Sequence, residues 1–447
     1  MSNAHRGQAG GARKRDAMGL GLAALTKIAS APIIDKFGLR KQFETLVQSG
    51  TRTGFRAAGA ATRSFKKAQG HNKPARLTPA PAKDLFDLSP DDEQSLIAET
   101  VSEFAAEQLR PAAVDADAKL APPEDLLERA GELGLSVVGI PESLGGIGTE
   151  RSAVTNVLVT EALAHGDMGL AVAVLAPSAV STALTLWGDE DQQATYLPAF
   201  AGESVPAAAL ALQEHVALGD PLKPTTTAKR TPQGYQLSGT KSLVPRAAQA
   251  ELFIISANLD GSPALFLVES STNGLSIEAD PAMGLRSAGT GKVHLDDVNV
   301  PVTALLGGGQ LDVFTDLVRL SRLGWSALAA GTGKAVLDYV IPYVNERTAF
   351  GEPISHRQAV AFSVADIGIE LESIRLTTLR AAARAEQGKP FAREAALARK
   401  LATDKGMLIG NLGVQLLGGH GYTKEHPVER WYRDLRAIGV MEGAVLV

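Results

Sequence analysis

Apolar residues recur at helical spacing from about residue 84 to residue 206 and again after residue 310. Between these regions, short β-leaning runs such as ELFIISA and ALFLVE alternate with turn-rich dipeptides. The pattern predicts a mainly α, α+β chain in which helices precede a small antiparallel β domain and a helical bundle follows it. The predicted parts are a basic extension with a Pro-rich linker (1–83), an N-terminal helical domain (84–206), a middle β domain (207–309) and a C-terminal bundle (310–447).

The helices carry start signals and long apolar repeats. In LSPDDEQSLIAETV, Ser89 is predicted to be the N-cap and Pro90 the first helical residue, followed by acidic residues that suit the positive end of a helix. After residue 310, apolar spacing predicts long helices over 311–347, 356–387 and 391–418.

Composition excludes several kinds of site. The 447 residues include no cysteine, which rules out disulfides, thiolate metal sites and a cysteine nucleophile. The 8 histidines form no HExxH or HxH pattern, so we predict no dedicated metal site. Hydrophobic residues make up 45% of the chain and charged residues 21%, which is typical of a soluble globular protein.

Charge is distributed unevenly along the chain. Residues 1–76 contain 15 Lys and Arg against 3 Asp and Glu, a net charge of +12, whereas the whole chain carries −5. Within this basic arm, Met18–Ile34 is apolar but is interrupted by Lys27 and Pro32. These interruptions disfavour both an export signal and a membrane span.

The basic arm suggests an anionic surface as its partner. We expect peripheral contact with a membrane, because the positive charge is interleaved with apolar residues. Packing of the arm on the rest of the chain is an equal alternative, and nucleic acid ranks last because no DNA-binding motif is present. The expected location is the cytoplasm, with the arm at a membrane. A mitochondrial leader would also be basic and poor in acid, so that alternative stays open.

The end of the chain, MEGAVLV, places one carboxylate, Glu442, in an apolar stretch. The ordinary interpretation is a solvated and idle side chain, because Glu is almost never fully buried unless it is paired. The functional interpretation is a base that its apolar neighbours adapt for proton transfer near neutral pH.

Three ordered phrases resemble the acyl-CoA dehydrogenase family, and the resemblance covers about residues 86–445. WGDEDQQATYLP resembles a helix-to-helix phrase of the family, and NERTAFGEPISHRQAVAFSVADI resembles its ERxxFG signature. VQLLGGHGYTKEHPVERWYRDLRAIGVMEGA resembles its closing phrase, which contains the EGT motif. The resemblance implies an N-terminal helical domain, an antiparallel β-barrel middle domain and a C-terminal four-helix bundle.

In that family the Glu of the EGT motif is the catalytic base, and it aligns with Glu442. The implied reaction is α,β-dehydrogenation of an acyl-CoA thioester: the base removes the α-proton and the β-hydride passes to N5 of FAD. The backbone N–H of the base is implied to polarise the thioester carbonyl. Some relatives take the base from another helix, but that position here is Ser321, which cannot act as one.

The resemblance also implies a FAD site. Charged and polar contacts to the diphosphate and adenosine are expected partly across a subunit interface, which implies a homodimer or homotetramer. An electron-accepting flavoprotein is the implied redox partner. The residues that match the family's cofactor contacts are Arg347, Phe350, Gln358, Gln415, Gly418, Gly419 and Thr290.

Other family positions have changed in this chain. Each of them lacks a side chain that contacts the flavin in relatives, namely Gly219, Leu243, Pro245, Ala349 and Ala444. The alternative function is therefore a flavin-poor, non-catalytic partner subunit of a mixed assembly. The length and branching of the acyl chain and the electron acceptor are not encoded in a readable motif.

Overall fold

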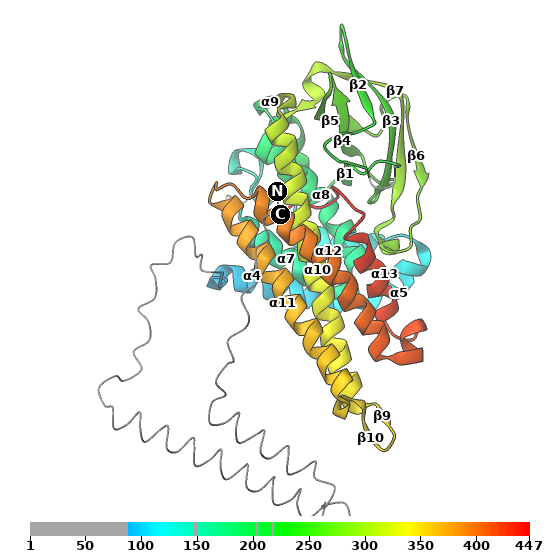
Figure 1. Ribbon diagram of the computed structural model, residues 1–447. Coiled ribbons are helices and arrows are strands. Elements are labelled where there is room, and N and C mark those ends of the chain that lie inside the picture. The colour runs from blue at the N-terminus through cyan, green and yellow to red at the C-terminus, as the bar shows by residue number, and fades with distance from the viewer. Residues whose placement is uncertain (1–87, 147–150, 203, 217–218) are drawn as a thin grey trace, which may run out of the picture. The chain divides into compact units, whose positions relative to one another are not determined.

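The computed structural model describes residues 88–146, 151–202, 204–216 and 219–447. The predicted basic arm and the Pro-rich linker (1–83) lie outside the described residues, so the expected membrane contact remains a prediction. In the described part, helices come first, a β-sheet follows, and long helices close the chain (Figure 1).

The first described helix, α4, begins two residues later than predicted. Asp91, and not Ser89, is the N-cap, because it forms a capping box with Gln94: the Gln94 N–H donates to Asp91 Oδ1 (2.8 Å) and the Asp91 N–H to Gln94 Oε1 (3.2 Å). The helices are α4 (Asp92–Phe104), α5 (Arg110–Lys119), α6 (Glu124–Glu132), α7 (Ala153–Gly166), α8 (Met168–Trp187) and α9 (Glu190–Phe200), with one π-turn at Ala105–Leu109.

Helix α8 is the one described helix long and apolar enough to cross a membrane by length and composition. In this fold, 89% of its most apolar window is buried by other parts of the protein. Its apolar character is therefore explained by its place in the core, where it packs against α7 and β1.

The middle region is one 8-stranded sheet with the order β6-β7-β3-β2-β4-β5-β8, and β1 pairs with β4. Most pairings are antiparallel, as predicted, but β1–β4 and β2–β4 are parallel. Phe253 and Phe266 are fully buried between the strands. The strands are β1 (Ala208–Ala211), β2 (Thr227–Thr231), β3 (Gly234–Val244), β4 (Leu252–Leu259), β5 (Ser262–Glu269), β6 (Leu275–Ala279), β7 (Gly291–Pro301) and β8 (Leu305–Leu306).

Three long helices and one short helix form the C-terminal region: α10 (Leu311–Glu346), α11 (Gln358–Glu386), α12 (Ala392–Leu416) and α13 (Val428–Ala437). The β-sheet lies at one end of the long helices, and a small hairpin of β9 (Thr348–Ala349) and β10 (Glu352–Pro353) lies at the other (Figure 1). The predicted helices are present within two residues at each end.

Candidate active site

The tail that follows α13 folds back into the protein and carries Glu442. Gly443 and Ala444 both have positive φ (74° and 71°), which turns the chain inward. The Ser321 hydroxyl and the Trp325 indole N–H each donate to the Gly443 carbonyl at 2.8 Å. Ser321 therefore holds the tail on α10, which agrees with the expectation that it is not the base. All the tail residues from 443 to 447 are buried.

The Glu442 carboxylate is held by Arg322, one residue after Ser321 on α10. Arg322 Nη2 lies 2.9 Å from Glu442 Oε1, and Arg322 Nε lies 3.2 Å from both carboxylate oxygens. This is a bidentate, charge-assisted contact, and the Glu442 side chain is only 14% exposed. Glu442 is thus a paired and largely buried acid, and the expectation of a solvated side chain is wrong.

A second guanidinium lies beside the same carboxylate. Arg399 Nη2, on α12, is 3.8 Å from Glu442 Oε1 and donates to the Met441 carbonyl. Burial lowers the pKa of Arg399 to about 10, and its Nη1 is buried without a hydrogen-bond partner. Two cations therefore surround one carboxylate, which leaves the cluster with an excess positive charge.

The backbone of Glu442 is also engaged. Its N–H donates to Oε1 of Gln213 at 3.1 Å, just beyond the end of β1. The family resemblance assigns this N–H to the substrate carbonyl, but in this structure Gln213 already accepts it. Sequence reasoning missed Gln213, Arg322 and Arg399 as site residues, although Arg322 adjoins Ser321.

Beside Met441 lies a small apolar cavity of about 190 Å³. Leu243 and Thr290, two positions that the family associates with the flavin, both line it. Asp280 already accepts the hydrogen bonds that Leu243 and Thr290 could give to a ligand. Its carboxylate accepts from the Leu243 N–H (3.0 Å), and its carbonyl accepts from the Thr290 hydroxyl (2.8 Å). The cavity can bury a flat apolar group but offers it few free hydrogen bonds.

The remaining predicted cofactor residues lie toward the other end of the helices. Arg347 follows the last residue of α10, and 25 helical residues at 1.5 Å each place it roughly 37 Å from Arg322. Gln415 is likewise roughly 24 Å along α12 from Arg399. The single chain thus does not gather the predicted residues into one cluster. The predicted cofactor residues at this far end are all exposed, namely Arg347, Phe350, Gln358, Gln415, Gly418 and Gly419.

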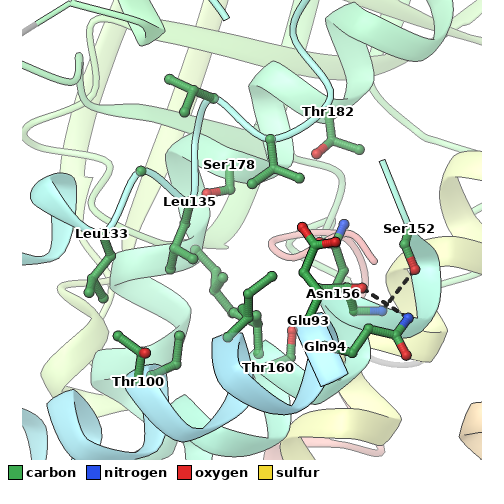
Figure 2. A pocket seen from close by; sticks show the side chains of 18 of the residues that line it. Glu93, Gln94, Thr100, Leu133, Leu135, Ser152, Asn156, Thr160, Ser178 and Thr182 are labelled. Atoms are coloured by element: carbon green, nitrogen blue, oxygen red, sulfur yellow. Dashed lines mark hydrogen bonds between the residues drawn. The ribbon is translucent and has the colours of Figure 1, made fainter. Parts of the chain in front are cut away.

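A second cavity, of about 690 Å³, lies between α4, α7 and α8. In Figure 2, Thr100 and Leu133 stand on one side of it, and Gln94 and Ser152 on the other. None of the predicted site residues lines this cavity, but Leu446 of the buried tail does. A ligand bound there would contact the tail that carries Glu442 without contacting Glu442 itself.

A buried acidic pair braces α13 ahead of the tail. Asp167 accepts from Arg430 Nε (3.0 Å) and from the Ser287 hydroxyl (2.9 Å), while Asp434 accepts from the Leu285 N–H (2.7 Å). Burial and the negative charge of Asp167 raise the pKa of Asp434 to about 7. Burial and the neighbouring carboxylate outweigh the attraction of Arg433 and Arg430, which favours the neutral form of Asp434.

This pair predicts a stability that depends on pH. Between about pH 4 and pH 7, folded Asp434 keeps a proton that the unfolded chain loses, so the free energy of unfolding falls as the pH rises through that window. Asp434→Asn, which keeps an oxygen for the Leu285 N–H, should flatten this dependence and gain stability relative to the unmodified chain at pH 8. Urea unfolding at pH 5 and pH 8 measures this, with the exposed Asp260→Asn as control. Equal slopes in all three proteins would contradict it.

Most of the described chain matches known protein-family models. The family models for the acyl-CoA dehydrogenase N-terminal, middle and C-terminal domains match residues 91–204, 209–298 and 311–445. The mitochondrial short-chain specific acyl-CoA dehydrogenase of Bos taurus is 32% identical over 358 residues, covering 78% of this chain and 86% of the relative.

Solved structures give the same result. Butyryl-CoA dehydrogenase from Megasphaera elsdenii has a TM-score of 0.73 and 27% identity, covering 79% of this chain and 95% of that one. The FAD complex of PigA has a TM-score of 0.73 and 25% identity, covering 80% and 95%. The predicted fold class is therefore confirmed, and the chain belongs to the acyl-CoA dehydrogenase family of flavoprotein oxidoreductases.

Proposed function

We propose that this chain is a FAD-dependent dehydrogenase that introduces a double bond between the α and β carbons of an acyl-CoA thioester, with Glu442 as the base. The observation that carries the proposal is the placement of Glu442. It lies on a buried tail, is oriented by Arg322, and follows Met441 at the wall of the apolar cavity that Leu243 and Thr290 line.

The chain's own residues have defined tasks in this reaction. The Glu442 carboxylate takes the α-proton after it turns from Arg322 toward the substrate. Arg322 and Arg399 hold the carboxylate in place before the substrate arrives. The Glu442 N–H becomes a donor to the thioester carbonyl once Gln213 releases it. When bound, FAD supplies the acceptor for the β-hydride.

The residues present fit a dinucleotide flavin in two separate places. The apolar cavity at Leu243 suits a flat ring system, and the exposed Arg347 suits a diphosphate. A Cβ added to Gly418 or Gly419 would meet nothing within 4 Å, so the backbone there is open to close approach by a ligand. The resemblance implies a hydroxyl at four positions that here are Gly219, Pro245, Ala349 and Ala444. Their loss would weaken binding by roughly 2–6 kcal/mol, because each neutral hydrogen bond contributes about 0.5–1.5 kcal/mol.

The two places are too far apart for one chain to offer both to one cofactor. The roughly 37 Å of α10 between Arg322 and Arg347 favours a site shared by two copies of the chain. We therefore propose a homodimer or a homotetramer. An electron-accepting flavoprotein is the proposed redox partner; a chain of a structure described as an electron transferring flavoprotein of Acidaminococcus fermentans is among the similar folds, with a TM-score of 0.73 and 28% identity.

Arg347→Ala is expected to release flavin. Losing a charge-assisted contact to a phosphate costs about 1.5–3 kcal/mol, which corresponds to roughly 10–100-fold weaker FAD binding. Titration of FAD into the stripped protein and the flavin absorbance after gel filtration measure the loss. Arg393→Ala, which removes an exposed arginine from α12, should keep the unmodified stoichiometry. Equal flavin retention in both variants would contradict the assignment.

A flavin-poor partner subunit is the second candidate. This candidate is favoured because the Leu243 N–H and the Glu442 N–H already donate to Asp280 and Gln213. The family positions that lack hydroxyls favour it as well. The flavin content of the purified chain separates the two functions. About one FAD per chain, with turnover of an acyl-CoA, supports the enzyme. No flavin even in excess FAD supports the partner subunit.

A further inference from the structure

We propose that His420, Glu425 and His426 form a binding site for a divalent transition metal. All three lie on the segment between α12 and α13. One ligand atom from each residue can be chosen so that the three atoms lie within 4.8 Å of one another. Sequence reasoning predicted no metal site, because the spacing H-x4-E-H matches no familiar motif and only folding of the loop brings His420 back toward the other two residues.

The surroundings of His426 leave one ring nitrogen available for a metal. The Tyr339 hydroxyl on α10 lies 2.6 Å from His426 Nδ1, and the rings of Tyr339 and Tyr343 pack edge-on against the imidazole. Metal-binding histidines usually donate their other ring N–H to such a partner, which fixes the tautomer and the ring orientation. With Nδ1–H donated to the Tyr339 oxygen, Nε2 of His426 is the ligand atom.

The other two ligands come from the exposed side of the loop. His420 Nδ1 lies 3.7 Å from Glu425 Oε2, and both side chains are about half exposed or more. The Thr423 N–H and hydroxyl both donate to the His420 carbonyl, at 3.1 Å and 2.9 Å, so the backbone that presents this imidazole is braced. The two exposed side chains are free to adjust around an ion.

The donor set decides which metals fit. Two imidazoles and one carboxylate suit Zn²⁺, Co²⁺ or Ni²⁺ better than Mg²⁺ or Ca²⁺, which prefer oxygen ligands. In a tetrahedral zinc site with bonds of about 2.0–2.2 Å, ligand atoms lie roughly 3.4 Å apart, so on binding the ligand atoms approach one another by at most about 1.4 Å. Three protein ligands leave a fourth position for water.

The metal site is distant from Glu442, but it adjoins Gly418 and Gly419 of the proposed diphosphate half-site. It lies at the end of α12 far from Arg399, and a bound ion would tie the loop to α10 through the His426–Tyr339 contact. The loop also contains Gly418 and Gly419 at its start and leads into α13. Metal binding is therefore expected to stiffen the segment that connects the far end of the bundle to the tail.

The test is calorimetric titration of the metal-free full chain with ZnCl₂. Because His5 and His71 of the arm could also bind zinc, the reference protein carries His5→Ala and His71→Ala. We expect one ion per chain with micromolar affinity, and Co²⁺ should give the visible absorption of a tetrahedral complex. His420→Ala and Glu425→Gln should each weaken binding at least about 10-fold, and Tyr339→Phe, which keeps the ring but removes the hydroxyl, about 10–100-fold.

The matched control is His356→Ala. His356 also lies near a carboxylate, with its Nδ1 3.3 Å from Glu352 Oε2. It belongs to no group of three potential metal ligands among the described residues. Its replacement should leave zinc affinity unchanged. His426→Ala could disturb packing against the two tyrosines, so the exposed His420→Ala is the decisive variant. Unchanged affinity in His420→Ala, or no 1:1 binding by the reference protein, would overturn the proposal.

Discussion

Replacing Glu442 by glutamine should lower kcat for acyl-CoA oxidation by about 10²–10⁴-fold, the range that a positioned general base contributes. The amide keeps the shape of the side chain, and its oxygen can still accept from Arg322, but it cannot take the α-proton. The measurement is steady-state turnover with an acyl-CoA and an artificial electron acceptor, on enzyme with its flavin content determined first. The spectrum of bound flavin should remain the same as in the unmodified protein.

The control for Glu442→Gln is Glu370→Gln. Glu370 is also a carboxylate paired with a cation, Lys405 at 2.6 Å, but it lies on α11 away from the tail. Its replacement should leave kcat within about twofold, because neither Glu370 nor Lys405 is among the residues of the proposed active site. Near-normal turnover in Glu442→Gln would sink the assignment of the base while leaving the flavin site and the family membership intact.

Replacing Lys241 by methionine should destabilise the β domain by about 3–5 kcal/mol, because it strands a buried carboxylate. Lys241 is fully buried, and its ammonium donates to Glu214 and to Ser256 Oγ (2.9 Å). Burial lowers the pKa of Lys241 to about 8. Burial also opposes the charged form of Glu214, but the adjacent ammonium and hydrogen bonds outweigh it and lower the pKa of that carboxyl.

The double variant Lys241→Met/Glu214→Gln separates the cost of an orphaned charge from the value of the pair. A buried ion pair replaced as a whole is often nearly neutral, so the double variant should recover most of the loss. Thr225 and the Thr226 N–H both donate to Glu214 and could still donate to the amide oxygen. The midpoint of urea unfolding at pH 7 measures all three proteins. A loss below about 1 kcal/mol in Lys241→Met would refute the argument.

Much of the fold could be predicted from apolar periodicity, because α10, α11 and α12 repeat it over 25 residues or more. The exact start of a helix depends on local hydrogen bonds, which apolar periodicity does not predict. Asp91 displaced Ser89 as the N-cap because Gln94 stands three residues after Asp91 and completes a reciprocal pair. The parallel pairing of β1 with β4 joins strands about forty residues apart, and no local pattern encodes it.

In the candidate site, too, sequence predicts some residues and tertiary packing determines the others. The identity of Glu442 followed from a phrase of sequence, but its partners did not. Arg322 and Arg399 lie 120 and 43 residues before it and meet it only through helix packing. The distance between Glu442 and Arg347 likewise depends on the length and course of α10, so the matched motifs alone do not reveal how far apart these two residues lie.

The separation of the two half-sites along α10 has a genetic consequence. In a dimer that forms each site from Glu442 of one chain and Arg347 of the other, two defective alleles can rescue each other. Glu442→Gln and Arg347→Ala chains that assemble together produce one site with both original residues and one site with neither. Random pairing of equal amounts should therefore restore roughly a quarter of the original number of intact sites, whereas Glu442→Gln alone has only sites without the base and Arg347→Ala alone only sites that bind FAD weakly. Carriers of two different weak alleles would then retain activity that carriers of either allele alone lack.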